Sequence, residues 1–500
     1  MKNDYYKKSA KTVALFCLYI ALVRFTNGFF LGIMVLMGMV WAFNGKVGKA
    51  ISIYVMIAFM VIINPNILPK VGVIYTMGLR VGPLLLGLAL VCKGSSSQSK
   101  RRLPLGVMLA YLVVAIISSI NGWSPRISYM KLVNFAVFFV GIWLGTQSLE
   151  YDRSGVCVLR STFFALAFFL IIGSIALIPF PAVSTMSGLQ QVQFSGNLAI
   201  LNKILEEAAL GGEMFLFCGV TMHSQVLSPL LACTFAWLIC DLLFVEEELK
   251  WPHVVLIVLS LPLMYKTRSR VALLTIMVSL LLVYSYLPRH IRLQPMVKRW
   301  LGSILMVFAF ALITVTVVLE LQGNVISRWM RKTDDVDFDR RSLSEAFTAS
   351  RQGLVEECMD DFRRNPLFGS GFQVSWFSEE LAQGQGGIVL SSPIEEGVLP
   401  LMVLGETGLV GGIVFIAFLF SFFSAGRCRR LYMTVTMMCV LLSTNFGEAT
   451  FFSPGGLGGT LWIMCIVGGY VLDMSLSLQS RRGVITATRG IDRWQQGCGF

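Results

Sequence analysis

Arginines beside long apolar runs are the residues of this sequence that are best suited to chemistry. Arg268 and Arg270 lie in the short segment Thr267-Arg268-Ser269-Arg270, Arg80 lies within an apolar run, and Arg351 lies in a long charged segment. A guanidinium group can bind two phosphate oxygens at once, so these side chains are suited to a phosphate or diphosphate at a membrane edge. Alternatively, Arg268 and Arg270 snorkel at a span boundary, Arg80 marks the end of its span, and Arg351 forms a surface ion pair.

The composition indicates what kind of molecule holds these arginines. The 500 residues are 55% hydrophobic and 14% charged, with a mean hydropathy of +0.72, whereas soluble domains contain about 25% charged residues. Apolar stretches recur from end to end, each long enough to cross a bilayer core of roughly 30 Å. Collagen, disorder, a secreted disulfide scaffold and a soluble enzyme are excluded. The sequence predicts an all-α polytopic membrane protein.

Residue types that bind metals are sparse in this chain. Its three histidines are isolated, and no HExxH, CxxC or EF-hand pattern is present. We therefore predict no metal and no cofactor.

Hydropathy predicts about 12 to 14 transmembrane helices. The apolar runs lie at approximately 12–26, 28–43, 50–64, 72–92, 104–121, 132–147, 161–180, 225–245, 252–266, 271–287, 301–319, 397–424, 431–445 and 457–473. Arg24 and Asn27 interrupt the first long run, which we interpret as a hairpin of two short spans.

The positive charge is concentrated in alternate connections between these runs. The net charge is +13, and its Lys and Arg clusters fall in every second connection and at both termini. Lys and Arg are retained on the cytoplasmic side of bacterial membranes, so both termini are predicted to be cytoplasmic. Nucleic acid is not a predicted partner, because no basic stripe is interleaved with exposed aromatics.

The spans and loops divide the chain into four parts. Residues 1–319 form an N-terminal transmembrane bundle with an outer loop at 181–226, and 320–396 form a large extracytoplasmic loop. Residues 397–473 form C-terminal transmembrane helices, and 474–500 form a cytoplasmic tail. The 320–396 loop holds eight Lys/Arg and fourteen Asp/Glu. A loop of this length is usually functional, although a spacer on the membrane surface is the alternative.

The large loop contains a predicted amphipathic helix. Ser342-x-x-Glu345 is a capping box, and apolar residues follow it on one helical face. Asn365-Pro366 is predicted to end this helix, and the turn Phe368-Gly369-Ser370-Gly371-Phe372 follows.

Three segments resemble the O-antigen ligase and polymerase superfamily of membrane glycosyltransferases, in the order and spacing of that family. Thr267-Arg268-Ser269-Arg270-Val271-Ala272-Leu273-Leu274 is similar to its "SRG-A-L" segment. Arg351 followed by Asn365-Pro366-Leu367-Phe368-Gly369-Ser370-Gly371-Phe372 is similar to "R…PLFGxGF". Leu401-Met402-Val403-Leu404-Gly405-Glu406-Thr407-Gly408-Leu409-Val410-Gly411 is similar to "LxxLxExGLxG". The resemblance covers roughly residues 260–425, and the first half of the chain shares only hydropathy and topology with the family.

The resemblance implies a donor glycan linked through a diphosphate to a polyprenol, and a glycan acceptor, at the outer face of the bacterial inner membrane. Arg268, Arg270 and Arg351, which lie in these segments, would bind the diphosphate, and guanidinium groups would stabilise the leaving group without a metal. Arg80 lies outside the segments and could line the same site. Membrane lipid and other polysaccharide-assembly proteins are the further partners that it implies.

The chain departs from the family at the position of the catalytic base. Ligases and many polymerases carry a His just before the third segment, where this chain has Gly397, preceded by Glu395 and Glu396. Either carboxylate could act as the base if desolvation raised its pKa, or the pair only hydrates the span entrance. His223 is a weaker candidate base, and Glu406 is expected to serve packing or helix-end hydrogen bonding.

The leading functional hypothesis is polymerisation of lipid-linked repeat units in exopolysaccharide or surface polysaccharide biosynthesis. The missing His favours a polymerase over ligase-type transfer to another acceptor. A flippase or exporter of the same glycan, or a non-catalytic membrane scaffold, are the alternatives.

Overall fold

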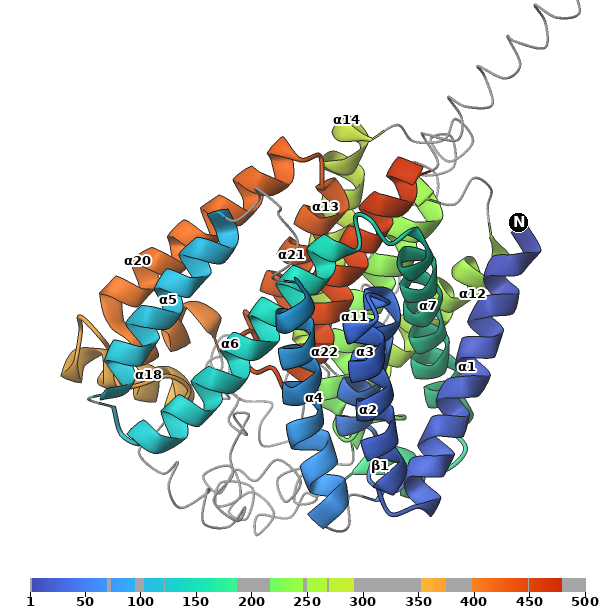
Figure 1. The fold of residues 1–500 in the computed structure, drawn as a ribbon, viewed down its shortest axis with the longest axis horizontal. Coiled ribbons are helices and arrows are strands. Elements are labelled where there is room, and N and C mark those ends of the chain that lie inside the picture. The colour runs from blue at the N-terminus through green and yellow to red at the C-terminus, as the bar shows by residue number, and fades with distance from the viewer. Residues whose placement is uncertain are drawn as a thin grey trace, which may run out of the picture.

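Long apolar helices make up nearly all of the part of the chain that the computed structural model describes, which is residues 2–69, 73–94, 103–120, 122–186, 216–245, 250–267, 269–291, 352–374, 398–447 and 449–478 (Figure 1). In the first half the helices are α1 (Lys2–Phe25), α2 (Phe29–Phe43), α3 (Val47–Val61), α4 (Val73–Gly94), α5 (Leu103–Ile120), α6 (Pro125–Ser148), α7 (Arg153–Ala176) and the short α8 (Pro181–Ser184). They are followed by α11 (Ser224–Cys240), α12 (Trp251–Lys266), α13 (Arg270–Ser285), the short α14 (Leu287–His290), α18 (Gln352–Arg364), α20 (Leu399–Cys428), α21 (Tyr432–Thr444) and α22 (Leu457–Trp462). Two π-helical turns, η1 (Asp241–Val245) and η3 (Ile463–Val467), continue α11 and α22.

The helices match the apolar runs of the sequence. Among the described residues, six helical stretches are long and apolar enough to cross a membrane: Pro125–Ser148, Arg153–Ala176, Ser224–Val245, Val271–Arg289, Leu399–Cys428 and Leu457–Leu478. Shorter apolar helices accompany them, and α1 and α2 form the predicted N-terminal hairpin, with a turn at Asn27 and Gly28. The predicted run at 301–319 lies outside the described residues. The chain is therefore a multi-pass helical membrane protein.

Three helices begin well before the spans that hydropathy predicts for them. α1 starts at Lys2, α6 at Pro125 and α7 at Arg153, whereas the predicted runs start at 12, 132 and 161. The extra turns contain charged residues such as Lys131 and Arg160, which lower hydropathy but are good helix formers. Hydropathy measures the apolar length of a helix, whereas helical hydrogen bonding continues beyond it.

Successive helices run in opposite directions, so their connections collect at two ends of the bundle. Figure 1 shows the start of α1 and the short α14 at one end, and β1 and α18 toward the other. We call these the N-terminal end and the loop end. The connections at the N-terminal end carry Lys46, Lys93, Arg289, Arg427 and Arg430, in agreement with the alternation of charge in the sequence.

The described parts of the 181–226 loop are fixed to the loop end of α3. Strands β1 (Thr185–Met186) and β2 (Leu216–Phe217) pair antiparallel, with Thr185 opposite Phe217. Asn64, just after α3, donates from Nδ2 to the carbonyls of Val183, at 2.6 Å, and Gly219, at 3.2 Å. A buried amide that bonds both arms of the loop holds them on the bundle.

Close backbone contacts join the helices of the first half. A Cβ built on Gly87 of α4 would lie 2.9 Å from Val137 of α6, and one on Gly141 of α6 would lie 2.6 Å from the carbonyl oxygen of Gly87. Small residues allow such approach in membranes, where packing replaces the hydrophobic effect as the main force between helices. Since α4 and α6 both run from the loop end, this contact also sets their register.

An aromatic cluster joins α5, α6, α20 and the segment before α22. Tyr111 stacks on Phe452 with 5.0 Å between ring centroids, and Phe415 lies 5.5 Å from Phe452. The ring of Phe372, from the large loop, packs 5.9 Å from Phe135 and 5.7 Å from Phe452. The described part of the loop is thus built into the core of the bundle.

Candidate functional site

Helix α20 is broken close to its loop end. Gly408 has φ 64° and ψ −166°, a conformation that is essentially limited to glycine. Because of the break, the carbonyls of Gly405 and Glu406 and the amides of Leu409 and Val410 have no hydrogen-bond partners within the helix. Non-helical backbone at membrane depth is tolerated only where other protein groups or water satisfy it.

The segment 366–374 supplies those partners. The amides of Ser370 and Gly371 donate to the carbonyls of Gly405, at 2.9 Å, and Glu406, at 3.1 Å. In return, the amides of Leu409 and Val410 donate to Pro366, at 2.8 Å, and Leu367, at 3.2 Å. Two of the segments that resemble the glycosyltransferase superfamily therefore pair with each other along the backbone.

The α5–α6 connection holds the other side of this segment. The Trp123 amide donates to the Ser370 carbonyl at 3.0 Å, and the Ser128 hydroxyl donates to the Phe372 carbonyl at 3.0 Å. The Ser118 hydroxyl donates to the carbonyl of Glu406, and the buried ammonium of Lys131 donates to the carbonyl of Gln373. We call residues 118–131, 366–374 and 405–410 together the junction.

Helix α18 docks beside the junction through Asp361. Its carboxylate accepts from Trp123 Nε1 at 3.0 Å and from the Ser370 hydroxyl at 3.1 Å, and the Arg364 guanidinium lies 4.8 Å from the Trp123 ring centroid. Burial raises the pKa of Asp361 above its usual range, although both hydrogen bonds oppose this. The end of α18 at Arg364 and the turn after it agree with the sequence prediction; the predicted start at Ser342 lies outside the described residues.

The junction itself has little capacity to bind an anion. The amides at the start of the second half of α20 would otherwise form the positive end of a helix dipole, but Leu409 and Val410 use theirs on Pro366 and Leu367. The side chain of Glu406 is 3% exposed, and its backbone carbonyl anchors two neighbouring segments. These contacts agree with the expectation that Glu406 serves packing and helix-end bonding, and they make the junction a scaffold for residues around it.

Most of the predicted site residues lie outside the described part of the chain. This applies to Arg268, Arg351, Glu395 and Glu396. For Arg80 and Arg270 the structure describes the backbone within α4 and α13 but not the side chain.

The starts of α13 and α20 lie close together at the loop end. Arg270 is the first residue of α13, and the Ser269 hydroxyl before it accepts from the Ala272 amide at 3.4 Å. Val271 packs against Gly447. Two residues earlier, the Asn445 carbonyl accepts from the amide of Leu399, the first residue of α20, at 3.0 Å. The structure thus brings the beginning of α13 near the helix that follows Glu395 and Glu396 in sequence.

Arg80 is placed by its neighbours in α4. Gly78 and Gly82 on either side of it contact Leu31 and Val35 of α2. From the register set by Gly87 and Gly141, the backbone of Arg80 is level with the first turns of α6, where Lys131 lies. The side-chain placement that the diphosphate hypothesis needs lies outside what the structure describes.

His223 has a local structural role. It is the N-cap of α11, and its Nδ1 accepts from the Gln225 amide at 2.9 Å. The ring nitrogen that could accept a proton from a substrate is therefore partly committed to the helix. This favours the structural interpretation of His223 over the catalytic one.

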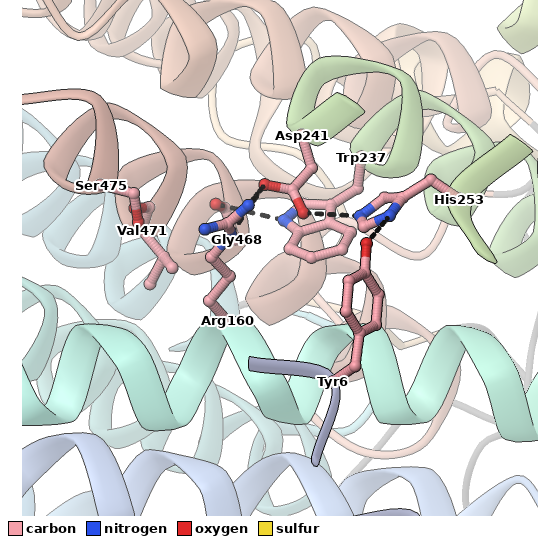
Figure 2. A network of polar contacts seen from close by, with 8 residues as sticks. All are labelled: Tyr6, Arg160, Trp237, Asp241, His253, Gly468, Val471 and Ser475. Atoms are coloured by element: carbon pink, nitrogen blue, oxygen red, sulfur yellow. Dashed lines mark hydrogen bonds and ion pairs between the residues drawn. The ribbon is translucent and has the colours of Figure 1, made fainter. Parts of the chain in front are cut away.

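Sequence reasoning missed a buried network at the N-terminal end (Figure 2). Asp241 Oδ1 accepts from Arg160 Nε at 2.8 Å, and Asp241 Oδ2 lies 2.9 Å from His253 Nε2. His253 Nδ1 lies 3.0 Å from the Tyr6 hydroxyl, and the Arg160 guanidinium lies 4.6 Å from the Tyr5 ring centroid. The chain therefore links α1, α7, η1 and α12 through satisfied polar groups.

One feature of the sequence could have indicated this network. Asp241 is an acid at the end of a long apolar run, and ionisable groups in such positions are normally paired. Arg160, which donates to Asp241, and Tyr6, which pairs with His253, come from distant helices, so no spacing in the sequence marks them. Lys131 was missed for the same reason, because its acceptor at Gln373 is 242 residues away.

Metal chemistry has no visible support in the described ranges. No group of three or more His, Cys, Asp or Glu side chains within them could hold a metal ion.

No protein-family profile matches the chain, and no curated protein matches it. The family resemblance therefore stays a prediction from the motifs alone.

Proposed function

We propose that this chain is a membrane glycosyltransferase that polymerises polyprenyl-diphosphate-linked oligosaccharide repeat units at the outer face of the bacterial cytoplasmic membrane. The observation that supports the proposal most is the junction, where two motif segments far apart in sequence share four backbone hydrogen bonds. Segments that resemble one family by residue type alone need not meet in space. Their pairing favours a common site at the loop end.

The proposed reaction uses the site residues predicted from the sequence. The acceptor hydroxyl oxygen attacks the anomeric carbon of the donor, the bond from that carbon to the diphosphate oxygen breaks, and the proton passes to a carboxylate. In this proposal Glu395 or Glu396 takes the proton, and Arg268, Arg270, Arg351 and Arg80 bind the departing diphosphate. Arg270 is the first residue of α13, and Glu395 and Glu396 precede α20 in the sequence. The starts of these two helices lie near each other.

Export of the same lipid-linked glycan is the second candidate, and the break in α20 favours it. Interrupted helices are common at the substrate sites of transporters, where they supply polar backbone groups. In α20, however, the amides of Leu409 and Val410 and the carbonyls of Gly405 and Glu406 already bond protein groups. Because the backbone groups at this break already bond the protein itself, the break is better suited to holding a loop than to binding a transported glycan.

Depletion of the protein in its own host separates the two functions. Under the polymerase proposal, single lipid-linked repeat units accumulate at the outer leaflet, where periodate added to intact cells oxidises them. Under the export alternative, the units accumulate at the inner leaflet and are protected until the cells are opened. Normal long polymer after depletion would contradict both.

A further inference from the structure

A cavity opens at the N-terminal end, away from the junction. It is partly open, lies between α6, α20, α21 and the α22–η3 helix, and has an interior space of about 50 Å³. Its lining is almost wholly apolar and includes Phe139, Trp143, Phe422 and Ile466. Such a lining suits hydrocarbon, because its walls offer water few hydrogen bonds.

The polarity of the cavity changes along one face of α6. Phe139, Trp143 and Gln147 all line it, and residues four apart lie above one another at about 6 Å per turn. Phe139 is the deepest, and Gln147 is one residue from the end of α6 at Ser148. The wall therefore passes from an apolar ring to an indole and then to an amide toward the membrane surface.

Trp143, midway along this change in polarity, has a buried indole N–H group with no hydrogen-bond acceptor among the described residues. A buried donor without a partner costs about 1–3 kcal/mol. An oxygen-bearing ligand in the cavity would remove this cost.

The mouth of the cavity carries a basic side chain. Arg429, at the end of α20, lines it. No acidic residue occurs between Thr407 and Phe446. The nearby Asp473 is committed to the start of α21, where it accepts from the amides of Met433, at 3.1 Å, and Thr434, at 2.9 Å.

We propose that this cavity binds one anionic glycerophospholipid from the leaflet at the N-terminal end. An acyl chain lies against Phe139 and Phe422, an ester oxygen accepts from Trp143 Nε1, and the phosphate lies beside Arg429. The three zones of the lipid follow the order of the three zones of the wall. The site is separate from the proposed transferase site, which lies at the loop end.

Native mass spectrometry of the purified full chain, titrated with phosphatidylglycerol or phosphatidylcholine, tests the proposal. We expect one tightly retained phosphatidylglycerol in the wild type. Ala425→Phe, which fills the cavity, lowers its affinity at least tenfold, whereas Ala417→Phe, on an exposed position of the same helix, leaves it unchanged. If these two variants retain phosphatidylglycerol equally well, the lipid does not bind in this cavity and the proposal is wrong.

The contacts of the lipid headgroup with Arg429 and of the ester oxygen with Trp143 Nε1 are tested separately by variants that preserve the cavity. Arg429→Gln should weaken phosphatidylglycerol about fivefold and abolish its preference over phosphatidylcholine, as expected for loss of one basic residue near a membrane surface. Arg427→Gln removes the same charge from an exposed position outside the cavity and should have no effect. Trp143→Phe should weaken both lipids. Equal wild-type affinity for the two lipids, or equal effects of the two arginine variants, overturns the anionic assignment.

Discussion

Gly408 determines whether α20 can bond the 366–374 segment. Its φ of 64° and ψ of −166° suit only glycine, and a Cβ there would lie 2.4 Å from the Leu367 carbonyl carbon. Gly408→Ala should therefore lower the free energy of unfolding by about 2 kcal/mol or more, seen as a lower Tm in detergent. Gly32→Ala is the matched control, because that position is helical and has no atom within 4 Å of its Cβ. An unchanged Tm in Gly408→Ala would show that the break is not required.

Arg270 is the arginine on which the diphosphate hypothesis depends most. Arg270→Lys keeps the charge but loses the planar group that binds two oxygens, so polymer output should fall markedly. Arg270→Ala should be at least as severe while the protein stays in the membrane. The control is Arg289→Ala, which removes an exposed arginine from the N-terminal end. Polymer of wild-type length and yield in Arg270→Ala would reduce Arg270 to a residue at a span boundary.

Glu395 and Glu396 are the candidates for the catalytic base. A base that takes the acceptor proton in the transition state contributes roughly 10²–10⁴-fold to the rate. Glu395→Gln or Glu396→Gln should reduce polymer formation by a factor in this range, with accumulation of lipid-linked repeat units on thin-layer chromatography. Full polymer output from both single variants would exclude the pair.

At the scale of elements, the helices could be predicted but their internal break could not. Hydropathy and turn residues act locally, so α2, α3 and the end of α18 at Asn365-Pro366 follow from neighbouring residues. The break at Gly408 has no such local cause, since α20 also contains Gly405, Gly411 and Gly412. Only the pairing with a segment about 40 residues away selects Gly408, and pairing over that distance leaves no period in the sequence.

The Asp241 network gives a second test at this scale, because it holds four helices together. Asp241→Ala would remove the buried carboxylate to which Arg160 donates, and breaking a buried ion pair in this way costs about 3–5 kcal/mol. Tyr6→Phe removes one hydrogen bond and should cost only about 1 kcal/mol. Thermal unfolding in detergent measures both, with Tyr284→Phe on the exposed face of α13 as a neutral control. Equal Tm values for Asp241→Ala and the wild type would show that the network carries no stability.

At the scale of the whole molecule, the order and direction of the helices were the most predictable features. Each connection repeats the same two signals, an apolar run and a charge bias. The described helices preserve this alternation, with Lys46, Lys93 and Arg427 at the N-terminal end. The candidate site was predictable only as a set of segments, because the contacts between those segments form through tertiary packing.

The alternation also makes a prediction about sidedness. The start of α21 is bonded to Asp473 near the end of the last described helix, so that helix ends at the N-terminal end of the bundle. Residue 374 lies in the junction, at the loop end. If Lys and Arg mark the cytoplasmic side, the loop beyond residue 374 is outside and residues after 478 are inside.

Labelling with a membrane-impermeant thiol reagent tests this prediction in intact cells. The eleven native cysteines are first replaced, and single cysteines are placed at Ser378 or Ser480. We expect Ser378→Cys to react in intact cells and Ser480→Cys to react only after the membrane is opened. The reverse result would place the loop end and its arginines in the cytoplasm, where the donor glycan of the proposed reaction is not displayed. It would thus contradict the orientation and the transferase proposal together, while the lipid cavity at the other end would keep its geometry and change only its leaflet.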